Sequence, residues 1–400
     1  MTDPRLHFKT PLLTSPFHAR TATLNKLNSW GPWGGYTTAL AFDDVSMEHC
    51  AIRNQATVYD LTPMKKYRIT GKDATDYLNR LTIRNAAKLK VGHVHYTAWC
   101  DEHGKLLDDG TLFRYGDTHY LLCCQERHLP WLIDSAFGYD VAIADVTKEI
   151  AALSLQGPCS WAVLRKAGFQ EAANLKPFQM ADFAFGDSGK LTISRTGFTG
   201  DLGYELWTTP DRALELWDRL FEAGSLYGIR PVGTTALNMA RIEAGFIITN
   251  LDFISAEQAV RNDRARSPFE MGLDWMIDFG KGHFNGRRAL LDEKARNTSK
   301  WALVGLDVEG NVSAENSLIY HDKKHEVGHV TAAIWSPTVK RNIALALVER
   351  PYHAEKSDNL WIEIYAMREL QYHKLMVRAR VTERPFFNPS RRRASPPADF

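Results

Sequence analysis

Apolar and polar residues alternate in several short runs of the first third of the chain, at the spacing of half-buried β-strands. Strands are expected over four of these runs, 66–70, 95–100, 105–115 and 119–124. The segment Asp101-Glu-His-Gly104, between the second and third run, is rich in turn-forming residues. The last three runs therefore predict an antiparallel meander.

Other segments have the 3.6-residue spacing of amphipathic helices. The clearest covers 210–227, and helices are also expected over 73–81, with Asp73 as the N-cap, and over 234–243. The strand that ends at Leu155-Gln-Gly-Pro158 should lead into a further helix, because proline is favoured in a first helical turn. Helices beside antiparallel strands indicate an α+β fold.

The pattern changes after Leu290. Residues 292–300 are polar and basic, as in a linker, and short strand-like runs follow at 302–307, 342–348 and 360–365. These runs predict a separate all-β C-terminal domain over 300–388. The last residues, 389–400, hold three consecutive arginines and two prolines in a row, and we expect a poorly ordered tail there.

Three large aromatic residues, Trp30, Trp33 and Tyr36, lie in a segment rich in glycine and proline. Such a segment cannot form a regular helix and is expected to be a loop. Two interpretations are open. The rings either pack against the edge of a domain or line a pocket for a cationic methyl donor, since cations are attracted to aromatic faces.

Composition narrows the possible functions. A chain of 400 residues predicts two or three domains, and a formal net charge of +2 argues against a nucleic acid as the main partner. No apolar run is long enough to span a membrane and no secretory signal is recognisable, so we expect a cytoplasmic location. The five cysteines are scattered and indicate neither a disulfide framework nor a metal site.

The most specific signal is the segment Arg195-Thr-Gly-Phe-Thr-Gly-Asp-Leu-Gly-Tyr-Glu-Leu-Trp207. Its glycines permit a tight loop between two strands. By itself this predicts only a bulged hairpin, because neither the GxGxxG spacing of a dinucleotide site nor the Lys-Ser/Thr of a phosphate loop is present.

This segment resembles the R-x-G-Y-T-G-E-x-G-Y-E signature of glycine-cleavage T-proteins and their relatives. Further blocks resemble the same family in the same order, namely 58–64, 106–109, 155–158, 240–245, 268–273, 284–287, 336–338 and 343–346. The resemblance covers roughly residues 25–390. It implies a three-domain clover-leaf around a central tetrahydrofolate site, with antiparallel sheets and helices in two domains and a barrel-like third.

Within that fold we expect two discontinuous domains before the C-terminal β domain. The folate-binding first domain is expected to comprise 1–55 and 140–245, and the second 56–139 and 246–292. The oligomeric state stays open.

The resemblance also assigns roles to individual residues. It places Glu205 at the pterin, whose pyrimidine edge offers two parallel donors that a carboxylate can accept. It places Asp108 near the reactive nitrogens of folate, as the catalytic carboxylate, while Asp109 is expected to be structural. Arg241 is expected either to bind a carboxylate of folate or substrate, or to pair with a neighbour such as Glu243.

Further residues are expected to contact the cofactor through the same resemblance: Tyr96, Tyr204, Phe198 and Met64. For the two tyrosines, packing in the core is an equal alternative. No metal site is expected.

Departures from the T-protein pattern favour a demethylase, similar to the tetrahydrofolate-dependent dimethylsulfoniopropionate enzymes. The Arg and Asp of the family's GARDTLRLE block are Leu237 and Asn238, and the YGQEMDE block has no counterpart in 247–253. We therefore expect methyl transfer from a small onium or methoxy substrate to folate N5, without a lipoyl carrier protein. The alternatives are an aminomethyltransferase that forms 5,10-methylenetetrahydrofolate and a folate-binding protein without activity.

Overall fold

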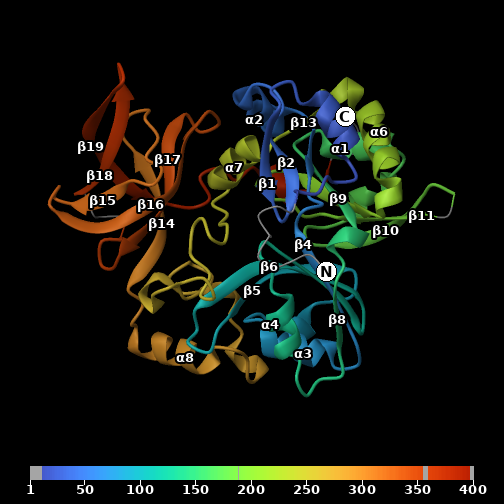
Figure 1. Cartoon of the computed structure of the whole chain (residues 1–400), viewed down its shortest axis with the longest axis horizontal. Helices are drawn as coiled ribbons and strands as arrows, with labels where there is room; N and C mark the ends of the chain where they lie inside the picture. The colour runs from blue at the N-terminus through green and yellow to red at the C-terminus, as the bar shows by residue number, and fades with distance from the viewer. Residues whose placement is uncertain (1–10, 188, 355–358, 397–400) are drawn as a thin grey trace.

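The computed structural model describes residues 11–187, 189–354 and 359–396. Two open sheets and a closed barrel form the framework, and Figure 1 shows the barrel on one side and the two sheets on the other, one above the other. This is the three-part α+β arrangement with a C-terminal barrel that the sequence predicts.

The first sheet has six strands in the order β10-β11-β12-β9-β3-β13. Their bounds are Met180–Phe185, Gly189–Ser194, Gly203–Thr208, Ala151–Gln156, Thr57–Asp60 and Arg230–Pro231. One face packs on α5 (Ser160–Lys166) and α6 (Ala213–Gly224) through a large apolar cluster. The helix expected over 210–227 is confirmed in its central part, and 3₁₀ turns form its two ends.

The second sheet has five strands in the order β5-β6-β7-β4-β8. Their bounds are His93–Cys100, Leu106–Gly116, His119–Cys124, Lys65–Thr70 and Ala142–Asp145. The antiparallel pairing of β5 with β6 and of β6 with β7 confirms the predicted meander. Helices α3 (Ala74–Leu81) and α4 (Leu129–Asp134) cover its outer face.

The C-terminal barrel closes in the order β14-β17-β16-β15-β18-β19. Its strands are Trp301–Val308, Arg341–Glu349, His325–Ser336, Leu318–His321, Leu360–Arg368 and Gln371–Thr382. Helix α8 (Arg287–Arg296) precedes the barrel, so the expected linker at 292–300 begins within a helix. Helix α7 (Thr234–Glu243) lies between the barrel and the six-stranded sheet (Figure 1), where α2 (Val45–Asn54) packs against it.

The aromatic segment is not a loop, which corrects the prediction. It forms a hairpin of β1 (Ser29–Trp33) and β2 (Tyr36–Ala41), preceded by α1 (His18–Leu24). The hairpin turns at Gly34 and Gly35, whose φ angles are +57° and +90°. Two-residue turns with positive φ match the twist of antiparallel strands, and glycine adopts them at little cost. The glycines that argued against a helix therefore make the turn of a hairpin.

The part of the expected tail that the structure describes, residues 389–396, packs against the rest of the chain, whereas residues 397–400 lie outside the described residues. Arg391 forms an ion pair with Asp201 at 2.6 Å, and its side chain also donates to the Arg53 carbonyl at 3.1 Å. Arg195 donates to the backbone oxygens of Arg392 and Ala394. The chain thus returns from the barrel and packs against the signature loop of the six-stranded sheet.

The predicted domain boundaries stay a proposal, and strand pairing favours two changes to them. Strand β3 was assigned to the second domain but pairs with β9 in the six-stranded sheet. Strand β8 was assigned to the first domain but pairs with β4 in the five-stranded sheet. In the part of the chain that the structure describes, no helix has the length and apolar character needed to span a membrane.

Candidate functional site

The inner faces of the two sheets meet in an apolar cluster that α7 closes. Its members include Tyr59 and Trp207 from the six-stranded sheet and Phe113 and Leu121 from the five-stranded sheet. Met64 and Phe198, two of the predicted cofactor residues, are partly buried at its edge. Met64 and Phe198 thus lie where both sheets and α7 come together.

Glu205 lies on β12 and points to the same side of the sheet as Trp207, because side chains alternate along a strand. Only 9% of the residue is exposed, and burial raises its pKa to about 7. Among the described residues, only the Thr196 hydroxyl donates to the carboxylate, to Oε2 at 2.5 Å. The second oxygen is left for another donor.

A chain of hydrogen bonds fixes the orientation of this carboxylate. Since the Thr196 hydroxyl donates to Glu205, its oxygen accepts from the Ser194 hydroxyl at 2.7 Å. The Ser194 oxygen in turn accepts from the Trp207 indole at 3.3 Å. Each hydroxyl has one hydrogen, so the direction of the chain is set and Glu205 is its terminal acceptor.

Tyr204 does not face the same side, which corrects its prediction as a cofactor residue. It is fully buried in the apolar cluster under α5 and α6. The reason is the alternation of the strand, which directs Tyr204 and Glu205 to opposite faces. Core packing, the alternative left open by the sequence, is the role that the structure gives it.

Asp108, the predicted catalytic carboxylate, is surrounded by hydrogen-bond donors of the protein itself. It lies on β6 beyond the end of β7, with no exposed surface. Its Oδ2 accepts from the Glu126 backbone at 3.1 Å and lies 3.0 Å from His128 Nε2. Its Oδ1 accepts from the Thr249 hydroxyl at 2.5 Å and from the Asp109 backbone at 2.8 Å. Protein donors occupy both oxygens.

Asp109, expected to be structural, has the features predicted for its neighbour. It is partly exposed and accepts from the Tyr96 hydroxyl at 2.7 Å. Its other oxygen lies 2.9 Å from the Thr249 hydroxyl, whose single hydrogen is shared between the two aspartates. Burial and the adjacent charge of Asp108 raise its pKa to about 7. Both Asp109 and Ala98, its partner on β5, face away from the helices α3 and α4. A carboxyl that gains and loses a proton near neutral pH suits acid–base catalysis.

Arg241 pairs with Asp252 rather than with Glu243, the neighbour that the sequence suggested. Its guanidinium is fully buried and forms an ion pair with Asp252 at 2.5 Å, while Glu243 pairs with Arg53 at 2.6 Å. Asn238 accepts from Arg241 Nε at 2.8 Å. The sequence could not identify Asp252 as the partner, because it lies outside the helix, in the loop that follows.

Arg241→Met is therefore expected to destabilise the fold. Removing one member of a buried ion pair costs about 3–5 kcal/mol, because the other charge stays buried. Urea unfolding of the full chain should show this loss in the free energy of unfolding. Adding Asp252→Asn should recover part of it, since the uncompensated charge is then removed. An unchanged free energy of unfolding in Arg241→Met would contradict a buried pair.

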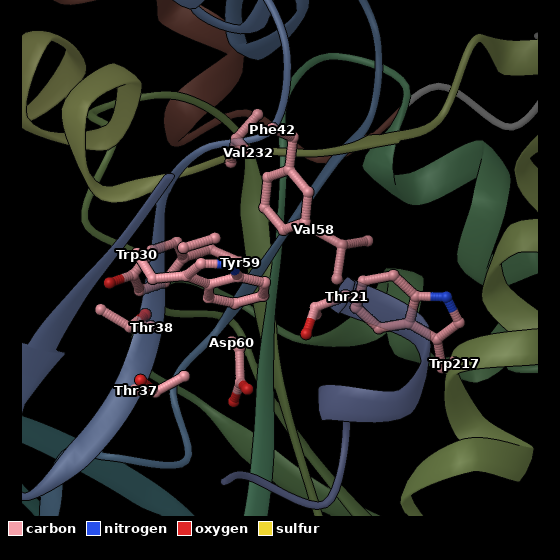
Figure 2. A pocket seen from close by; sticks show the side chains of 11 residues that line it. Thr21, Trp30, Thr37, Thr38, Phe42, Val58, Tyr59, Asp60, Trp217 and Val232 are labelled. Atoms are coloured by element: carbon pink, nitrogen blue, oxygen red, sulfur yellow. The ribbon is translucent and has the colours of Figure 1, made fainter. Parts of the chain in front are cut away.

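The aromatic hairpin does not form one pocket, so the structure does not support Trp30, Trp33 and Tyr36 as a joint substrate cage. Trp30 lines a small cavity with Tyr59, Asp60 and Trp217 (Figure 2). That cavity has a volume of about 10 Å³, the size of one water molecule. Trp33 instead donates from its indole to Gln125 at 3.0 Å, and Tyr36 is buried.

Sequence reasoning missed several polar residues of this site. Thr249 bridges the two aspartates, His128 contacts Asp108, and Thr196 orients Glu205. Thr196 had a signal, since a hydroxyl residue precedes the first glycine of the signature. Thr249 and His128 had no such signal, because both contact Asp108 from far along the chain. Thr249 lies 141 residues after it and His128 lies 20 residues after it.

These groups fit a pterin. One oxygen of Glu205 is free to accept, and the ionised carboxylate can accept both parallel donors of a pyrimidine edge. Met64 and Phe198, at the edge of the apolar cluster between the sheets, can pack on a flat ring. The Phe198 ring stacks on that of Phe246, with 5.4 Å between the ring centroids. Asp109 offers a proton-exchanging carboxyl at the neighbouring sheet.

Comparisons with known proteins agree with this geometry. Residues 14–281 match the model of the GCVT N-terminal domain, and residues 302–388 match the glycine cleavage T-protein C-terminal barrel domain. The chain is 31% identical to an aminomethyltransferase of Caldanaerobacter subterraneus over 324 residues, covering 80% of this chain and 84% of that protein. It is 30% identical to the Bacillus subtilis aminomethyltransferase over 360 residues, covering 89% and 94%.

Two further similarities extend the picture. A trimethylamine-oxide aldolase of Ruegeria pomeroyi is 35% identical over 318 residues, which are 76% of this chain and 39% of the aldolase. The crystal structure of the glycine cleavage system aminomethyltransferase T from Bartonella henselae superposes with a TM-score of 0.82 at 23% identity, covering 94% of this chain and 98% of that one. The latter similarity establishes the fold.

Proposed function

Because this chain belongs to the glycine-cleavage T-protein family of tetrahydrofolate-dependent one-carbon transferases, we propose that it moves a one-carbon unit from a nitrogen-bearing donor to tetrahydrofolate at the aminomethyl level. The relatives with the names aminomethyltransferase and trimethylamine-oxide aldolase are enzymes, which favours an active transferase over a folate-binding protein without activity. Tetrahydrofolate, when bound, supplies the nitrogen that accepts the carbon. The remaining roles belong to residues of this chain.

The observation that carries the proposal is the position of the Asp109 carboxyl, which faces the Tyr96 and Thr249 hydroxyls and whose pKa is raised to about 7 by burial and by the charge of Asp108. An amine leaves as a neutral molecule only if it takes up a proton as its C–N bond breaks. Asp109 would give that proton and regain one from the first folate N–H as that C–N bond forms, so that it ends unchanged. The second C–N bond of a methylene product would form as the carbon's bond to the donor sulfur breaks, and the sulfur would leave as a thiol with the proton of the second folate N–H. Tyr96 and Thr249 hold the two oxygens of Asp109 in place through this exchange. Glu205 is proposed to hold the pterin.

A second candidate is methyl transfer from a small methylated cation, which the sequence analysis favoured. Leu237 and Asn238 support it, because they lie on α7 where the T-protein pattern has an arginine and an aspartate. A cationic donor leaves as a neutral molecule when it loses a methyl group and needs no proton. The aminomethyltransferase relatives favour the first candidate, and the match to glycine cleavage T-proteins does not support the expectation that a lipoyl carrier is dispensable.

The product distinguishes the candidates. The purified protein would be incubated with tetrahydrofolate and either an aminomethyl-lipoyl carrier protein or a panel of N- and S-methylated compounds, and the folates identified by mass spectrometry. We expect 5,10-methylenetetrahydrofolate that disappears in Asp109→Asn. Formation of 5-methyltetrahydrofolate instead would establish the second candidate. The absence of any new folate would overturn both.

A further inference from the structure

The side chains of Asp108 and Asp109 meet at one hydroxyl group. The Oγ1 atom of Thr249, in the segment after α7, lies 2.5 Å from Asp108 Oδ1 and 2.9 Å from Asp109 Oδ1. A threonine hydroxyl has a single hydrogen and donates to one of these oxygens at a time. The second contact therefore needs a hydrogen from another source.

Asp108 has the surroundings of an ionised carboxylate. It accepts from the backbone N–H groups of Asp109 and Glu126, in addition to the Thr249 hydroxyl. His128 Nε2 lies 3.0 Å from its Oδ2, and an ionised oxygen makes this nitrogen the donor. Several hydrogen bonds to a carboxylate favour its charged form. A proton on Asp108 would have to displace one of these donors.

Asp109 has fewer donors, and the geometry gives it the missing hydrogen. Within the described part of the chain, its Oδ2 accepts from the Tyr96 hydroxyl, while its Oδ1 faces Thr249. If the Thr249 hydrogen goes to Asp108 and Asp109 is ionised, two oxygens lie 2.9 Å apart with no hydrogen between them. A proton on Asp109 Oδ1 removes this conflict, because it can donate to the Thr249 oxygen. The raised pKa of Asp109 agrees with this placement.

Other titratable or charged side chains act on the pair from the surrounding elements. They are Tyr67 on β4, Tyr96 on β5, Cys124 on β7, Asp252 with its partner Arg241, and Glu257, which lies 3.5 Å from His128 Nδ1. Burial raises the pKa values of the two tyrosines and the cysteine, so these groups stay neutral near pH 7. The charge of Arg241 is matched by Asp252, so among these groups His128 is the one that can place a positive charge next to Asp108.

We propose that Thr249 and His128 are positioning residues that place the single proton of the aspartate pair on Asp109 Oδ1 and keep Asp108 ionised. The hydrogen bonds then run in one direction, from Asp109 through the Thr249 hydroxyl to Asp108, and His128 donates to Asp108 from the other side. The proposal rests on the proposed function, since it names the residues that prepare Asp109 to give its proton to a leaving amine.

Infrared spectra of the full chain between pH 4.5 and 8.5 test where the proton lies, because a neutral carboxyl and a carboxylate have different C=O stretching bands. Glu205→Gln serves as the background, since Glu205 titrates in the same range. A neutral-carboxyl band should disappear as pH rises through about 7. Asp109→Asn should lack this band, because Asp108 stays ionised. Asp108→Asn should retain it with a lower midpoint, because burial still raises the pKa of Asp109 but the adjacent charge is gone.

Thr249→Val keeps the shape of the side chain but removes the hydroxyl that joins the two carboxyls. At pH 6, kcat for one-carbon transfer should fall about tenfold, the value of one hydrogen bond to a charged group, while the KM for tetrahydrofolate stays close to that of the wild type. Thr249→Ser keeps the hydroxyl and should restore kcat. Thr23→Val, at an exposed threonine of α1 whose hydroxyl donates to the Ala19 carbonyl, is the matched control.

His128 is tested by the same comparison of a disruptive and a conservative change. His128→Phe removes the donor to Asp108 and should also lower kcat at pH 6 about tenfold. His128→Gln has an amide N–H that can donate to Asp108 and should recover part of this loss. Equal kcat values in the two variants would remove His128 from the proposal.

A neutral-carboxyl band with an unchanged midpoint in Asp109→Asn would place the proton on Asp108 and overturn the proposal. A wild-type kcat in Thr249→Val would overturn it as well, as would a kcat in Thr249→Ser no higher than in Thr249→Val. Where Thr249→Val fails to fold, the infrared spectra of the two aspartate variants still decide. The expected spectra in a protein that forms no folate product would refute the proposed function alone. Product formation with the proton on Asp108 would refute this inference alone.

Discussion

Replacing Asp109 by asparagine is expected to lower kcat for one-carbon transfer by about 10²–10⁴-fold, the usual contribution of a general acid–base group. The amide keeps the size of the side chain and an oxygen that can accept from Tyr96 or Thr249, but it does not exchange a proton near neutral pH. The KM for tetrahydrofolate should stay close to that of the wild type. Steady-state kinetics with the donor identified by mass spectrometry would measure both constants.

The pH dependence provides a second test of the same residue. As a proton donor, Asp109 is competent below its pKa of about 7, so the wild-type rate should fall as pH rises through that value. Its folded-state pKa lies above the ordinary aspartate value of 3.8, so the native state binds more protons between these values. The stability that this group contributes is therefore complete below 3.8 and lost as pH rises through 7. Asp109→Asn should accordingly raise the melting temperature at pH 8 but not at pH 4.

Asp108→Asn is the matched comparison. The amide nitrogen would face one of the donors that now surround the carboxylate, such as His128 or the Glu126 backbone. Loss of one such bond in the interior costs about 1–3 kcal/mol, so this variant should melt at a lower temperature at every pH. A larger loss of kcat in Asp108→Asn than in Asp109→Asn would return the catalytic role to Asp108, as the family resemblance first indicated.

This pair of aspartates shows how far the sequence could identify the site. The alternation of side chains along a strand places Asp108 and Asp109 on opposite faces, but it does not tell which face is covered by α3 and α4. The same limit applied to Tyr204 and Glu205, which lie on opposite faces of β12. The resemblance placed both residues at the cofactor, whereas in the structure Tyr204 is buried in the core under α5 and α6. Local patterns predict faces, whereas burial depends on partners that are distant in sequence.

The fold was predicted well where contacts are local. The meander and the helices at 74–81 and 234–243 follow from periodicity within a few residues. The hairpin at 29–41 was missed because its glycines were interpreted as breakers of a helix rather than as the turn of a strand pair. The order of the C-terminal residues depends on Asp201, which lies 190 residues earlier, and no local pattern contains that contact.

Glu205→Gln is expected to weaken tetrahydrofolate binding by about 3 kcal/mol, or roughly 100-fold in Kd, because the charge-assisted bonds to the pterin edge are lost. The carboxylate must be ionised to accept both donors, and its pKa is about 7. Wild-type affinity should therefore fall as pH drops below 7, whereas the affinity of the Gln variant should be independent of pH in this range. Fluorescence titration between pH 5.5 and 8.5 would measure both.

Thr196→Val removes the hydroxyl that donates to Glu205 and tests whether this hydrogen bond acts on the charge of the carboxylate or only supports the strand. The hydroxyl stabilises the ionised carboxylate and thereby lowers the pKa of Glu205, opposing the effect of burial. Without it, the midpoint of the pH dependence should move upward, and the Kd at pH 7 should rise about tenfold, the value of one hydrogen bond to a charged group. Glu149→Gln, which changes an exposed carboxylate paired with Arg68, should change neither quantity.

If Glu205→Gln bound tetrahydrofolate like the wild type at every pH, the pterin would have to bind elsewhere. If Thr196→Val lowered affinity without moving the midpoint, the hydrogen-bond chain from Trp207 would support the strand rather than the charge of Glu205.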